Sequence, residues 1–128
     1  MEKIKSHTKV VIIGGGIMGV SLLYHLTKEG WKDLVLIEKG ELTSGSTWHA
    51  AGQCPQMIGS YNLAKVHLHS TNLYKTLEKE TGQPTGWHGC GSLRLAYKQE
   101  DLDWFHYVKG ILDNVGAPAE IISTNEIK

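Results

Sequence analysis

The feature that most constrains this chain is a glycine turn between a strand-like run and a helix-like run. The β-branched run Val10–Ile13 precedes Gly14-x-Gly16-x-x-Gly19, and apolar residues recur with helical spacing from Met18 onward. A continuous β-branched run is typical of a strand in a buried parallel sheet. The first glycine lets the chain turn sharply, the second lets a pyrophosphate approach the main chain, and the third lets the helix pack on the strand.

A second apolar run and an acidic residue complete the pattern. Gly30 predicts the end of the helix, and Leu34–Ile37 predicts a second strand. Strand, helix and strand at this spacing form a βαβ unit. Glu38 directly follows the second strand, where a carboxylate can accept hydrogen bonds from ribose hydroxyls and would repel a 2′-phosphate. The pattern therefore predicts a site for FAD or NAD and disfavours NADP.

The start of the predicted helix supplies the anion-binding groups. The main-chain N–H groups of Gly16, Ile17 and Met18 lie where a helix has no internal acceptors for them, so we expect orphan donors that attract a phosphate. The alternative is a glycine-rich turn that binds no ligand.

The segment from residue 41 to residue 52 is rich in small and hydroxyl side chains. Small residues such as Gly45 and Gly52 leave the main chain open to a flat ring system, and Ser46 and Thr47 can donate hydrogen bonds. Such a segment directly after the acidic residue suits a ligand longer than ADP lying along the chain, which favours FAD over NAD. The wider stretch Gly40–Gly59 is long and shows no periodic pattern, so we expect it to be a structureless functional segment.

Residues 10–52 resemble flavoproteins of the dimethylglycine dehydrogenase and sarcosine dehydrogenase group, within the glycine-oxidase and D-amino-acid-oxidase family. The run Ser46–Gly52, which reads STWHAAG, is similar to their hallmark. The similarity continues through Glu78–Gly82, Thr85–Trp87 and Gly91–Ala96, and it covers nearly the whole chain.

The resemblance implies how FAD is held. In that family the histidine after the tryptophan is joined covalently to the 8α carbon of FAD, and His49 holds that position here. Together with the turn glycines Gly14, Gly16 and Gly19, the expected cofactor contacts are Ile17, Met18, Glu38, Lys39, Gly45, Ser46, Thr47, Trp48, His49, Ala50, Ala51, Gly52 and Gln53. The pair Gln53–Cys54 departs from the family pattern, which leaves the polar surroundings of the flavin open.

The resemblance also implies an activity. We expect an FAD-dependent oxidoreductase that takes a hydride from the N-methyl C–H of a small methylated amino acid, dimethylglycine or sarcosine. Electron-transfer flavoprotein or oxygen would accept the electrons, and tetrahydrofolate would bind a region outside this chain. No acid–base residue is assigned, and no metal is expected. A non-catalytic regulatory relative and an NAD-dependent dehydrogenase are the alternatives.

The second half of the chain predicts two helices. Apolar residues recur with helical spacing over residues 63–77 and again over residues 102–115. Ser60 is the expected N-cap of the first of these helices, and Gly82 and Gly116 are the expected stops.

Two short strands and a capping box complete the sequence. Ser92–Tyr97 alternates as a half-buried strand does, and Ala119–Ile122 reads as a short strand. Ser123 followed by Glu126 is a capping box that predicts the start of a helix. We therefore expect residues 1–128 to be the N-terminal piece of a longer enzyme, inactive on its own.

The expected architecture is an incomplete α/β domain. Residues 1–59 form a Rossmann-like FAD-binding βαβ unit with its flavin loop, and residues 60–128 begin a mixed α+β substrate domain. The formal net charge of +0 gives no reason to expect nucleic acid as a partner. The two cysteines, Cys54 and Cys90, lack disulfide-scaffold or zinc spacing, and no apolar run could span a membrane. Without an apolar targeting segment, we expect a cytoplasmic protein.

Overall fold

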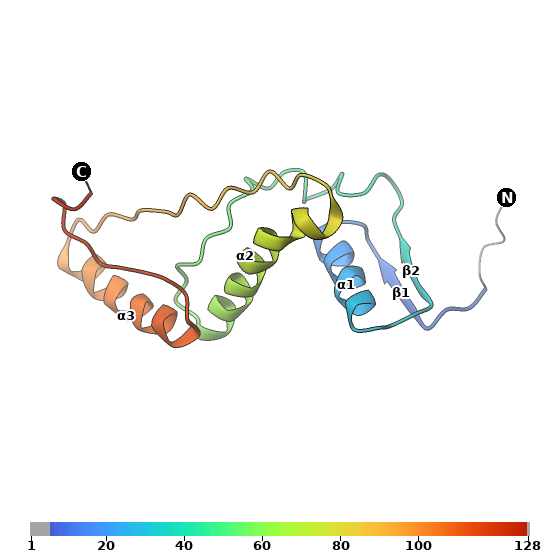
Figure 1. The fold of residues 1–128 in the computed structure, drawn as a ribbon, viewed down its shortest axis with the longest axis horizontal. Coiled ribbons are helices and arrows are strands. Elements are labelled where there is room, and N and C mark those ends of the chain that lie inside the picture. Colours follow the sequence, from blue (N-terminus) through green and yellow to red (C-terminus); the bar gives the residue numbers. More distant parts are fainter. Residues whose placement is uncertain (1–5, 128) are drawn as a thin grey trace. The chain divides into compact units, whose positions relative to one another are not determined.

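The computed structural model describes residues 6–127 (Figure 1). The chain divides into two compact units, residues 1–52 and residues 53–128. The division into cofactor-binding and substrate parts at residue 59 stays a prediction.

The first unit is a βαβ unit, as the sequence predicts. Strand β1 (Val10–Ile13), helix α1 (Ile17–Lys28) and strand β2 (Leu34–Ile37) follow one another (Figure 1). The strands are parallel and in register from Val10 opposite Leu34 onward. Helix α1 contacts both strands, so the glycine turn lies at the carboxyl end of β1 and the start of α1.

Helix α1 ends at a left-handed glycine, which confirms the predicted stop. Gly30 has φ +82 and donates its N–H to the carbonyl of Thr27 at 3.0 Å. The next N–H, of Trp31, reaches back to the carbonyl of Leu26 at 3.0 Å. These two bonds satisfy carbonyls that the last helical turn would otherwise leave without a donor.

Burial in the first unit is less complete than the apolar runs predict. Ile12 is buried, whereas Val11 and Ile13 on the same strand are 49% and 86% exposed. Met18 and Leu22 on α1 are also exposed. A parallel sheet is normally covered on both faces. In the first unit one helix packs on two strands, so part of the apolar surface stays uncovered.

The second unit is built on a helix pair. Helix α2 (Tyr61–Thr81) packs against helix α3 (Gln99–Val115). The buried core is Ala64, Val108, Leu112 and Ala117, with Met57, Ile58, Leu68, Ile111, Val115 and Ala119 packed around it. Both predicted helices are therefore confirmed. On α2, however, Leu63 and Val66 of the predicted apolar stripe are exposed, and Ala64 and Leu68 face α3 instead.

The helix ends in this unit also follow the sequence. Gly82 and Gly116 have φ +69 and +77 and end α2 and α3. Ser60 is the N-cap of α2, but only its main-chain carbonyl takes part, accepting from the Ala64 N–H at 2.8 Å; its side chain makes no capping hydrogen bond. At the end of α3, the N–H of Ala117 donates a hydrogen bond to the carbonyl of Leu112 at 2.9 Å.

The two short strands predicted in this unit are wrong. Residues 92–97 and 119–122 have no regular secondary structure. A strand needs a neighbouring strand to take its main-chain hydrogen bonds, and within residues 53–127 no strand lies beside either segment. Leu93, Leu95 and Tyr97 accordingly remain exposed.

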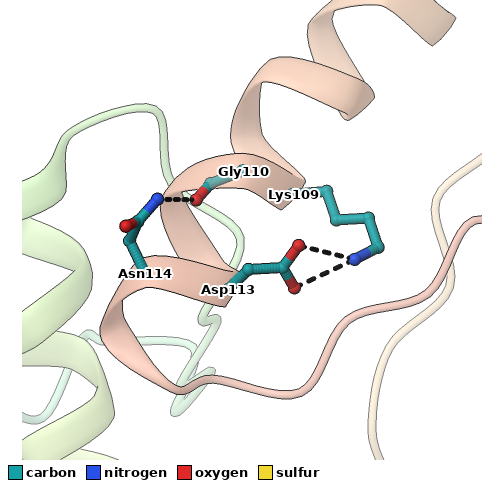
Figure 2. A network of polar contacts seen from close by, with 4 residues as sticks. All are labelled: Lys109, Gly110, Asp113 and Asn114. Carbon is teal, nitrogen blue, oxygen red and sulfur yellow. Dashed lines mark hydrogen bonds and ion pairs between the residues drawn. The ribbon is translucent and has the colours of Figure 1, made fainter.

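The exposed side of α3 carries two local contacts (Figure 2). The Lys109 ammonium contacts both carboxylate oxygens of Asp113, at 2.9 and 2.7 Å. The side-chain amide of Asn114 donates to the carbonyl of Gly110 at 2.7 Å. Both lie within one helical turn, so they stabilise α3 locally.

The predicted capping box forms its contacts without the predicted helix. The Glu126 carboxylate accepts from the N–H of Ser123 at 2.7 Å and from its hydroxyl at 2.8 Å, and these bonds lower the pKa of Glu126. Residues 124–127 form turns. Among the helices of residues 6–127, none has the length and apolar character needed to cross a membrane.

Candidate dinucleotide-binding site

The glycine turn between β1 and α1 has the geometry that its sequence predicts. Gly14 has φ +106 and donates its N–H to the carbonyl of Ile37 on β2 at 2.8 Å. At Gly19 a Cβ atom would lie 1.9 Å from the carbonyl oxygen of Gly14. Only glycine therefore allows α1 to pack this closely on the end of β1.

The middle glycine, Gly15, has a role that the sequence analysis did not assign. It is buried, and a Cβ there would lie 2.5 Å from Leu42 Cδ2. Its N–H donates to Glu38 Oε2 at 2.6 Å, and its carbonyl accepts from the Thr43 N–H at 2.9 Å. The turn is thus bonded to the chain that follows β2. The signal available in the sequence was that Gly15 fills the position between Gly14 and Gly16, where the motif itself does not require a glycine.

Glu38 is held as a carboxylate at the end of β2. Besides the Gly15 contact, its Oε1 accepts from the N–H of Gly40 at 2.9 Å. The Gly15 N–H, followed by that of Gly40, lowers the pKa of Glu38; partial desolvation opposes this shift, and Lys39 adds a smaller lowering. A carboxylate oxygen has two lone pairs, so each oxygen can still accept from a ligand hydroxyl.

The start of α1 has one donor already satisfied. Ile17 donates its N–H to Thr47 Oγ1 at 2.9 Å, so the prediction that this N–H is an orphan is wrong. A Cβ at Gly16 would lie 3.1 Å from the same oxygen. The N–H groups of Gly16 and Met18 make no hydrogen bond to a partner within residues 6–127, as predicted. The sequence could not reveal that a hydroxyl from the flavin loop lies at this helix terminus.

The first part of the predicted flavin loop is folded into turns, and the prediction of a structureless segment is wrong there. Residues 42–49 form consecutive turns. Main-chain hydrogen bonds over three residues join Trp48 to Gly45, His49 to Ser46 and Ala50 to Thr47, at 3.1, 3.2 and 3.3 Å. The small side chains therefore permit a compact coil of chain next to the glycine turn, because Thr43 and Thr47 both bond to it.

The other predicted contacts lie around this coil or beyond it. Met18, Lys39, Trp48 and His49 are exposed, and Trp48 is 78% exposed. The His49 ring makes no hydrogen bond or ion pair within residues 6–127. Ala51 and Gly52 follow without regular structure, and Gln53 belongs to the second unit. The structure thus joins Glu38 and Thr47 to the glycine turn, whereas the side chain of His49 has no partner among the described residues.

The geometry fits a dinucleotide. The turn presents free N–H groups at a helix start, a glycine main chain without Cβ atoms, and an ionised carboxylate at the end of the neighbouring strand. Residues 9–128 match the family model described as DAO, FAD dependent oxidoreductase. The chain belongs to this family. Its dinucleotide is therefore FAD, and the expected resemblance is confirmed.

Several curated relatives are similar over most of the chain. Mitochondrial dimethylglycine dehydrogenase of Rattus norvegicus is 54% identical over 103 residues, which are 80% of this chain and 12% of the relative. The mitochondrial pyruvate dehydrogenase phosphatase regulatory subunit of Mus musculus is 43% identical over 122 residues, 95% of this chain and 14% of the relative. The chain thus spans about an eighth of the length of these relatives.

A solved structure confirms the fold class. The L-proline dehydrogenase of P. horikoshii superposes with a TM-score of 0.85 at 29% identity, covering 97% of this chain and 32% of that one. The α/β architecture predicted from the glycine turn is therefore that of an FAD-binding oxidoreductase.

Proposed function

We propose that this chain binds FAD in an enzyme that oxidises the N-methyl carbon of a methylated glycine, dimethylglycine or sarcosine. One observation carries the choice of substrate class: several relatives are named for N-methylated amino acids. Besides dimethylglycine dehydrogenase, they are human sarcosine dehydrogenase at 37% identity and the 4-methylaminobutanoate oxidase of Paenarthrobacter nicotinovorans at 32%.

The described residues supply the binding groups for this proposal. The free N–H groups of Gly16 and Met18 would bind the pyrophosphate, and the Glu38 carboxylate would accept from the ribose hydroxyls. Bound FAD would supply the hydride acceptor for the substrate C–H bond. The exposed coil that ends in His49 would hold the flavin, and the family pattern assigns His49 as the covalent attachment point. Its exposed ring has no competing contact in the described part of the chain.

Other components of the proposal lie outside these residues. An electron acceptor, electron-transfer flavoprotein or oxygen, would reoxidise the flavin. Tetrahydrofolate would accept the one-carbon product in another region of the protein. No residue of this chain is assigned the role of orienting the substrate or of moving its proton.

Acid precipitation of the full-length protein tests the attachment. Flavin absorbance should stay with the acid-precipitated wild-type protein, and His49→Ala should release it while still binding FAD through the ADP half. His88→Ala, which changes an exposed histidine in an irregular segment of the second unit, is the matched control and should keep the flavin. Precipitable flavin in His49→Ala would remove His49 from this role.

A second candidate is a non-catalytic regulatory protein. The 43% identity to the phosphatase regulatory subunit, over 95% of the chain, favours it. A purified full-length protein without flavin absorbance, and without dye reduction on adding dimethylglycine or sarcosine, would support this alternative over the enzyme.

A further inference from the structure

One side chain, that of Thr47, fastens the flavin loop to the start of α1. Its Oγ1 accepts a hydrogen bond from the N–H of Ile17 at 2.9 Å. Among residues 41–50 Thr47 is the one that is partly buried, whereas the others are exposed. A hydroxyl can accept and donate at the same time, so Thr47 can keep this bond and still donate its proton to a ligand.

The residue expected to carry the flavin lies in a turn that begins at Thr47. The N–H of Ala50 donates to the carbonyl of Thr47 at 3.3 Å, which closes a turn with Trp48 and His49 at its two central positions. His49 follows Thr47 by two residues. The chain between the Ile17 contact and His49 is therefore a hydrogen-bonded turn and not a free stretch.

A second contact joins the same coil to the glycine turn, but farther from the histidine. The N–H of Thr43 donates to the carbonyl of Gly15 at 2.9 Å, and the carbonyl of Thr43 accepts from the N–H of Trp48 at 3.1 Å. Thr43 precedes His49 by six residues, and these bonds use main-chain groups alone. Without the Thr47 hydroxyl, the coil would stay attached at Thr43 while the turn that carries His49 gained freedom to move.

The helix residue that holds Thr47 lies between the two proposed pyrophosphate donors. These donors are the N–H groups of Gly16 and Met18, on either side of Ile17 in the sequence. All of these residues belong to the first unit. The main chain of His49 is thus fixed on the same helical turn that would hold the phosphates. Keeping two reacting groups in one arrangement raises the rate of the reaction between them.

We propose that Thr47 is a positioning residue for covalent attachment of the flavin at His49. The inference rests on the attachment proposed above. Attachment joins an imidazole nitrogen to the 8α carbon and releases one proton from the ring nitrogen and one from the methyl carbon. The two electrons pass through the flavin to dioxygen, which takes up both protons to give hydrogen peroxide. Thr47 acts on this step by fixing where the main chain of His49 lies.

The strength of a single hydrogen bond gives the size of the effect. Loss of one neutral hydrogen bond lowers the population of the arrangement that it holds by up to about fivefold. Because the Thr43 contact keeps the coil on the glycine turn, FAD should still bind and attachment should slow by about twofold to fivefold. Ile17 is exposed, so water can accept from its N–H when the hydroxyl is removed.

The test follows acid-stable flavin with time after FAD is added to the full-length apoprotein. The rate is measured at two saturating FAD concentrations, and equal rates at both show that attachment and not binding is observed. Thr47→Val replaces the hydroxyl by a methyl group of similar size, and Thr47→Ala removes it without adding bulk. Both should attach flavin about twofold to fivefold more slowly than wild type. Thr47→Ser keeps the hydroxyl and should restore the wild-type rate.

The matched control is Ser44→Ala in the same coil. The Ser44 hydroxyl also makes one hydrogen bond, to the carbonyl of Glu41 at 2.8 Å, but this bond does not reach the glycine turn. The control should attach flavin at the wild-type rate.

The outcomes separate this inference from the attachment itself. Equal rates in Thr47→Val and Ser44→Ala would overturn the positioning role alone, and so would a rate in Thr47→Ser as slow as that in Thr47→Val. If Thr47→Val does not fold, a wild-type rate in Thr47→Ala overturns it. A wild-type protein that forms no acid-stable flavin would overturn the attachment proposal and this inference with it.

Discussion

Replacing Gly19 by alanine should separate α1 from the end of β1. The new Cβ would lie 1.9 Å from the carbonyl oxygen of Gly14, whereas carbon and oxygen atoms in contact keep about 3.3 Å. The helix would have to move by more than about 1 Å, and the atom in the way is main chain, which cannot rotate aside. Overpacking costs about 1–3 kcal/mol, so we expect a loss of about 3 kcal/mol of unfolding free energy.

Gly110→Ala is the matched control. It places the same methyl group inside helix α3, where nothing lies within 4 Å, and should raise stability by about 0.5–1 kcal/mol through helix propensity. Denaturant unfolding and flavin content of the two full-length variants are compared. Gly19→Ala should also lose FAD, because the free N–H groups at the start of α1 would move with the helix. Equal stability and flavin content in the two variants would refute the close-packing argument.

Three further predictions follow from single contacts. Glu38→Gln offers one acceptor oxygen to two N–H donors, so denaturant unfolding at neutral pH should show lower stability than for the wild type. Folding lowers the pKa of Glu38, so the stability advantage of the wild type should be complete above about pH 4.5 and should disappear as the pH falls through the lowered pKa of the folded state. Gly116→Ala forces a side chain into φ +77 and should cost about 1–2 kcal/mol in the same assay, and no cost would show that α3 ends differently. Lys109→Met should change stability by less than about 0.5 kcal/mol, because its partner Asp113 is half exposed; a larger loss that persists in high salt would contradict this.

The sequence was most informative at positions where the local main-chain conformation or a close contact accepts one residue type alone. The glycines of the turn and of the helix ends predict the βαβ unit and the ends of α1, α2 and α3, because left-handed or closely approached main chain favours glycine. Glu38 was placed correctly after β2. Its second role, as acceptor for the Gly15 N–H, could not be predicted, because a main-chain donor has no signature in the sequence.

Prediction failed where structure depends on partners distant in sequence. Residues 92–97 alternate as a strand does, yet alternation reports which face is apolar and does not supply a neighbouring strand. Within the second unit, the hydrogen bond from the Gln56 amide to Thr71 Oγ1 was missed for a similar reason. A threonine within a helix and a glutamine before it are common, and only the packed structure shows that the two meet.

The hydroxyl of Thr47 on the Ile17 N–H has a consequence for which ligands the helix start selects. A ligand group that takes this N–H exchanges one hydrogen bond for another, so a neutral acceptor gains nothing there. A charged acceptor gains the difference between a charge-assisted and a neutral hydrogen bond, roughly 1 kcal/mol. The freed hydroxyl can then donate to the same anion. This arrangement discriminates by charge: it favours an anion over an uncharged group of the same size, and it keeps the Ile17 N–H bonded when neither is present.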